Sequence, residues 1–67
     1  MEKRYQIVRW DDPSDRYMVD ALSVDMAMET FADMSSGEVV SILDFKAGCA
    51  FTVVTENRYD HFYCLEF

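Results

Sequence analysis

Apolar residues recur with helical spacing in one stretch of the chain, residues 22–37. Five of them share one face of a 3.6-residue period: Val24, Ala27, Met28, Phe31 and Met34. Another face carries an acidic stripe at intervals of four: Asp25, Glu29 and Asp33. Ser23 is a good N-cap, and we expect Gly37 to end the helix in the left-handed conformation. The stretch is therefore predicted to be a helix that packs one face against a sheet.

The rest of the chain alternates between apolar and polar residues and is rich in strand-forming types. This pattern predicts strands at residues 3–10, 16–22, 38–45, 49–56 and 61–67. Turns are expected at 11–15 (Asp-Asp-Pro-Ser-Asp), 46–48 and 57–60. The element order is ββαβββ, so residues 1–67 are predicted to form a single small α+β domain. Its five-stranded, mainly antiparallel sheet carries one helix packed on one face.

Both faces of this sheet are expected to be apolar. In the last strand Tyr63 lies on the face opposite Phe62 and Cys64, and in the third strand alternation places Val40 and Ile42 opposite Val39, Leu43 and Phe45. A single helix covers only one face of a sheet. The second apolar face predicts either a homodimer or a surface for a different partner, and the sequence leaves both open.

Charge narrows the class of partner. Thirteen Asp and Glu residues stand against six Lys and Arg, a formal net charge of −7. This balance argues against direct binding to nucleic acid or an anionic membrane, since both need clustered basic residues. It favours a basic protein surface, and a nucleic-acid-binding protein would offer one. With no apolar run long enough for a signal peptide or a membrane span, we expect a cytoplasmic protein.

The residues that carry chemistry are few. His61 follows Asp60, but neighbours in a strand point to opposite faces and are poorly placed to form a catalytic pair. Cys49 and Cys64 are too few for a disulfide framework or a zinc site, and whether they pair is left open. No glycine-rich phosphate loop is present. We therefore predict no enzyme activity, no metal and no cofactor.

The acidic residues are unevenly distributed. Nine of them lie between Asp11 and Asp44, where Arg16 is the only basic residue. One interpretation is a solvated surface that promotes solubility. The other is a partner-binding site formed by the helix stripe and the preceding loop, with exposed aromatic residues as anchors. The residues predicted for that site are Asp11, Asp12, Asp15, Asp25, Glu29 and Asp33, with Trp10, Tyr59 and Tyr63.

In length, charge and element order the chain resembles the small acidic inhibitor proteins that bacteriophages encode, anti-CRISPR proteins among them. The resemblance includes no sequence motif, so it transfers no functional residue. It implies a non-enzymatic inhibitor that occupies a nucleic-acid-binding surface with carboxylates. Carboxylates four residues apart on a helix stand about 6 Å apart, whereas a DNA strand carries a charge about every 3.4 Å. The helix stripe would need other acids to imitate nucleic acid. The alternative is a structural protein that associates with itself through its second apolar sheet face.

Overall fold

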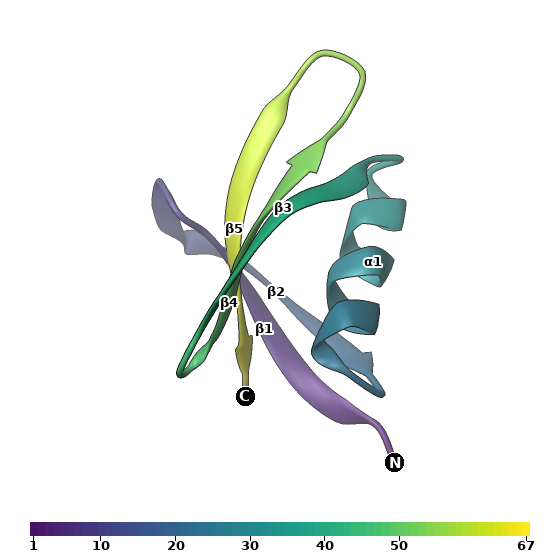
Figure 1. Cartoon of the computed structure of the whole chain (residues 1–67), viewed down its shortest axis with the longest axis vertical. Helices are drawn as coiled ribbons and strands as arrows, with labels where there is room; N and C mark the ends of the chain where they lie inside the picture. The colour runs from purple at the N-terminus through teal and green to yellow at the C-terminus, as the bar shows by residue number, and fades with distance from the viewer.

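The chain forms five strands and one helix, and the computed structural model describes residues 1–67 (Figure 1). The elements are β1 (Lys3–Arg9), β2 (Asp12–Ala21), α1 (Val24–Met34), β3 (Glu38–Phe45), β4 (Gly48–Val54) and β5 (Tyr59–Glu66). All strands belong to one antiparallel sheet with the spatial order β2-β1-β5-β4-β3. The helix packs on one face of that sheet. The predicted α+β class and the order ββαβββ are confirmed.

Strand β5 joins the two halves of the sheet. On one side of β5 is the β1–β2 hairpin, and on the other is the β3–β4 hairpin. Cys64 of β5 lies opposite Ile7 of β1 and opposite Cys49 of β4. The central strand therefore connects the first strand of the chain to its last three.

The first turn is shorter than the sequence predicts. The expected turn over residues 11–15 is wrong in extent, because β2 already begins at Asp12 and only Trp10 and Asp11 form the reversal. Pro13 lies inside β2. A proline is tolerated there because β2 is an edge strand, so the N–H that proline lacks is not needed to pair with a neighbouring strand. The pairing also shifts register between Val8 and Arg9. The register shift and the edge position together allow β2 to accommodate the proline.

The helix begins as predicted and ends differently. The Ser23 hydroxyl accepts a hydrogen bond from the Met26 N–H, as expected of an N-cap. At the other end the left-handed residue is Ser36, with φ 56°, and not Gly37. The N–H groups of Gly37 and Ser36 donate to the carbonyls of Ala32 and Asp33, the pattern of a Schellman motif. Gly37 is required for space instead, since a Cβ there would lie 2.6 Å from Val53 Cγ1.

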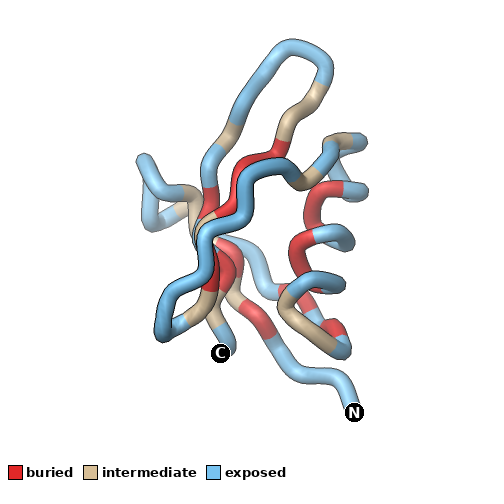
Figure 2. The backbone as a smooth tube through the Cα atoms, viewed as in Figure 1, coloured by how far each residue is buried: buried red, intermediate tan, exposed pale blue.

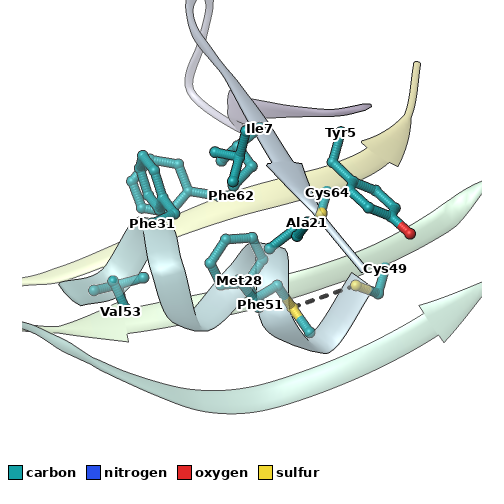
Figure 3. Packing of buried hydrophobic residues seen from close by; sticks show 13 residues of the cluster. Tyr5, Ile7, Ala21, Met28, Phe31, Cys49, Phe51, Val53, Phe62 and Cys64 are labelled. Atoms are coloured by element: carbon teal, nitrogen blue, oxygen red, sulfur yellow. Dashed lines mark hydrogen bonds between the residues drawn. The ribbon is translucent and has the colours of Figure 1, made fainter. Parts of the chain in front are cut away.

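The core lies between α1 and the sheet (Figure 2). Phe31 is at its centre, with its ring centroid 4.7 Å from that of Phe62 and 6.2 Å from that of Phe51 (Figure 3). These edge-to-face contacts between aromatic rings hold the helix against the sheet. The buried apolar residues are Tyr5, Ile7, Val19, Ala21, Ala27, Met28, Phe31, Ala32, Cys49, Phe51, Val53, Phe62 and Cys64.

A bulge in β3 changes which side chains face the helix. Val40 lies opposite Thr52 and Ile42 opposite Phe51, so Ser41 has no partner, and its φ is 52°. Directly opposed residues share a face, so Ile42 points to the helix side with Phe51. Strict alternation wrongly placed Ile42 with Val40. Beyond the bulge, Leu43 lies opposite Ala50 on the uncovered face.

With 11 residues, α1 is too short and too polar to cross a membrane, and the chain has no other helix.

Candidate protein-binding groove

The acidic stripe of α1 lies on the side of the helix next to β3. Ser23 fixes the start of the helix, and the buried face of Ala27, Met28 and Phe31 fixes its rotation on the sheet. Residues four apart then fall in one row. That row, Asp25, Glu29 and Asp33, is exposed to solvent.

Between this row and β3 the surface is hollowed. Two adjoining depressions of about 310 and 410 Å³ share Glu29 and Val39. No Lys or Arg lines either of them. We call the combined feature the acidic groove. Its apolar floor consists of Met28, Val39 and Ile42, and its acidic rim consists of Asp25, Glu29, Asp33 and Glu38.

None of the four rim carboxylates is neutralised by an ion pair. The ion pairs of the protein use four other acidic residues: Asp15, Asp20, Asp60 and Glu66. Nine of the thirteen carboxylates therefore have no basic partner, and four of these nine surround the acidic groove. The uncompensated charge of the protein is concentrated there.

Asp44 lies outside this groove, although it also belongs to β3. It lines a separate depression of about 410 Å³ near the start of α1, together with Lys3 and Lys46. Basic side chains are therefore present beside Asp44, unlike at the acidic groove. The negative region that the sequence shows between Asp11 and Asp44 is not continuous in the fold.

The predicted loop acids lie apart from the helix stripe. Asp11 and Asp12 are at the β1–β2 turn, on the opposite side of the molecule from α1 (Figure 1). Asp15 accepts a hydrogen bond from Arg9 Nε at 2.9 Å. That bond holds the pKa of Asp15 below its ordinary value. The structure thus brings together Asp25, Glu29 and Asp33, and it does not bring the loop acids to them.

The predicted aromatic anchors are also remote from the groove. Trp10 and Tyr63 lie on the sheet face that α1 leaves uncovered, where the Trp10 ring meets His61 at a centroid distance of 6.1 Å. Tyr59 is exposed at the start of β5. The groove uses aliphatic side chains in place of these aromatic ones.

The histidine and cysteines have structural partners. His61 Nδ1 lies 2.8 Å from Thr52 Oγ1, while Asp60 pairs with Arg9 and Arg58. Both cysteines are free thiols in the core. Burial raises the pKa of Cys49 and raises that of Cys64 to about 12, so both thiols stay protonated at neutral pH.

Sequence reasoning missed the contribution of β3 to the site. Glu38, Val39 and Ile42 belong to the groove because β3 runs along α1 as the outer strand of the sheet. Ile42 reaches the floor only through the bulge at Ser41, whose sequence gives no glycine or proline signal.

No protein-family model matches the chain, and no curated protein or solved structure matches it.

Proposed function

We propose that this protein is a non-enzymatic binding module whose acidic groove engages a basic surface of a larger protein. The observation that carries the proposal is the set of four unpaired carboxylates around an apolar floor. A merely solvated surface would not require Val39 and Ile42 beside those charges. A partner that combines basic and apolar side chains would match both features.

Each part of the groove has a separate role in this proposal. The carboxylates would steer a basic partner toward the groove and set its orientation, an effect that salt weakens. The floor of Met28, Val39 and Ile42 would supply apolar area that is removed from water on binding. The outer edge of β3 pairs with no other strand, so its backbone groups are available to a partner segment.

In its narrower form, the proposal makes the protein an inhibitor of the anti-CRISPR type. Its partner would be a cytoplasmic protein whose basic surface binds nucleic acid. Three rim carboxylates follow α1 at intervals of about 6 Å, and Glu38 adds a fourth from the sheet side. The rim would occupy positions that phosphates otherwise fill, and the inhibitor itself would bind neither nucleic acid nor membrane.

The test is charge reversal at matched positions. The groove variant changes Asp25, Glu29 and Asp33 to Lys. The control variant changes Asp11, Asp12 and Glu56 to Lys, which alters net charge equally at exposed carboxylates outside the groove and outside any ion pair. Each variant and the wild type serve as bait in cell extract, with captured proteins identified by mass spectrometry.

We expect the wild type and the control variant to capture the same partner and the groove variant to lose it. Rising salt should release the partner from the wild type. Equal capture by the groove variant, with its fold intact by circular dichroism, would refute the role of the groove. Equal loss from both variants would show that net charge, and not the groove, determines binding.

A further inference from the structure

The face of the sheet opposite α1 is covered by no other element (Figure 1). We call it the open face. Several large apolar side chains are exposed on it, among them Leu43, which is 69% exposed, and Trp10, which is 56% exposed. The register of the strands places the following uncharged residues on this face: Gln6, Val8, Trp10, Met18, Val40, Leu43, Phe45, Ala50, Thr52, Val54, Tyr59, His61, Tyr63 and Leu65. Four charged residues share the face: Arg4, Arg16, Asp20 and Glu38.

Aromatic residues hold the open face in a fixed shape. The ring of Tyr63 meets that of Phe45 edge to face at a centroid distance of 6.0 Å. Trp10 and Tyr63 border a shallow hollow of about 250 Å³, together with Leu43 and His61. Thr52 Oγ1 and His61 Nδ1 lie 2.8 Å apart and form a hydrogen bond with each other. The open face is therefore an ordered and largely apolar surface.

Charge indicates which partner this face fits. A chain of net charge −7 repels its own copies wherever unpaired carboxylates face each other. On the open face Asp20 is paired with Arg4, and Arg16 adds a positive charge on the edge strand β2. Glu38, which also lines the end of the acidic groove, stands at the margin of the open face, at the first position of β3. The other unpaired carboxylates lie elsewhere. A second copy can therefore approach the middle of this face without carboxylate repulsion.

We propose that two copies of this chain pack their open faces together as a symmetric dimer. The inference does not depend on the function proposed for the acidic groove, because that groove lies on the α1 side of the sheet. Two sheets packed in this way stand about 10 Å apart, with their side chains interdigitated. A two-fold axis through Tyr63 of the central strand β5 would bring the same residues of both copies together.

The size of the open face suits this arrangement. Five strands of about seven residues cover roughly 500 Å² in projection, since a strand rises about 3.3 Å per residue and neighbours lie about 4.8 Å apart. Stable interfaces hide about 600–800 Å² of accessible surface on each partner. Nearly the whole face must take part, so a single charge placed within it should be disruptive.

The first test is the mass in solution. Analytical ultracentrifugation across the micromolar range should give twice the 7.8 kDa of the monomer. Leu43→Lys should raise the dissociation constant at least about tenfold, since it buries a charge in the interface. Met34→Lys is the matched control, because Met34 on α1 is 65% exposed and lies off the open face. It should leave the dimer intact.

The second test distinguishes face-to-face packing from pairing along the β3 edge. Trp10 is the only tryptophan, and it lies on the open face and not at the outer edge of β3. Its emission should shift to the red on dilution, as the two faces separate. A wild type that is monomeric throughout would overturn the proposal and leave the face to a different partner. A dimer that survives both Leu43→Lys and Tyr63→Lys, or that dissociates without a shift in emission, would overturn it too.

Discussion

Arg9 Nη1 donates a hydrogen bond to Asp60 Oδ1 at 2.8 Å and so connects β1 to β5 by side chains as well as backbone. The two side chains are only 21% and 18% exposed. The guanidinium carbon also lies 4.9 Å from the centroid of the Phe62 ring. Arg9 thus pairs with a carboxylate of β5 and at the same time packs on a ring of the aromatic core.

Replacing Arg9 by Ala should destabilise the protein by about 2 kcal/mol, because it leaves the half-buried Asp60 carboxylate with only the exposed Arg58 as a partner. Urea denaturation followed by circular dichroism measures the loss. Arg4→Ala is the control, since the Arg4–Asp20 pair is solvent-exposed and should contribute little. An equal loss in both variants would contradict the importance of burial at Arg9.

The same pairs predict how stability depends on pH. Burial raises the pKa of Asp60, but the hydrogen bond from Arg9 and the nearby Arg58 outweigh burial and hold that pKa below its ordinary value of 3.8. The hydrogen bond from Arg9 also lowers the pKa of Asp15. The unfolded chain therefore binds these protons more readily, so their contribution is full above the ordinary value and is lost as pH falls through the folded values.

We therefore expect the stability difference between the wild type and Arg9→Ala to shrink between about pH 5 and pH 2. Urea midpoints measured for both proteins over this range test the expectation. A difference that stays constant with pH would show that Arg9 stabilises the fold mainly through its packing on Phe62.

Ser36→Gly should stabilise the protein by about 1 kcal/mol, because Ser36 holds a left-handed conformation that costs a side-chain-bearing residue about this much. Its hydroxyl makes no hydrogen bond that the substitution would remove. Thermal unfolding measures the gain. Ser35→Gly is the matched control: with φ −110° and a hydrogen bond to the Ala32 carbonyl, it should give no gain. A gain at Ser35 equal to that at Ser36 would refute the explanation.

Both cysteines should be unreactive in the native state. They are buried, and burial raises the pKa of each thiol, so alkylation requires an opening of the fold. At mildly alkaline pH, iodoacetamide should label the native protein at least about a hundredfold more slowly than the urea-unfolded protein. Mass spectrometry should find Cys49 and Cys64 modified together. Rapid native labelling of one cysteine alone would contradict the packing of the core around it.

The sequence predicts the features of this fold that depend on local patterns. The Ser23 cap and most of the apolar face of α1 need only neighbouring residues, so they could be predicted, and so could the element order. Met34 was wrongly included in that face, since it is exposed at the last turn of the helix. The close approach of Gly37 to Val53 and the bulge at Ser41 involve another strand, and no local pattern reveals them. The pairing of β1 with β5 likewise joins residues that are far apart in the sequence, so no local pattern indicates it.

The same distinction applies to the candidate site, of which only one part could be predicted from local patterns. The row of Asp25, Glu29 and Asp33 follows from helical spacing alone. Its isolation from Asp11 and Asp12, and its apolar floor, require the strand order that places β3 and the β1–β2 turn at opposite edges. Asp15 could not be separated from the free acids either, because its ion pair with Arg9 depends on the register of the β1–β2 hairpin, in which residues 13–15 of β2 have no partner in β1.

The central position of β5 has a consequence for synthesis of the chain. The β1–β2 hairpin touches the rest of the sheet only through β5, the strand farthest from it along the sequence. Until residues 59–66 have left the ribosome, the nascent chain has two separate pieces of sheet and no complete sheet on which α1 can pack. We therefore expect comparatively slow folding for a domain of this size, because the contact between β1 and β5 joins residues that are more than 50 positions apart.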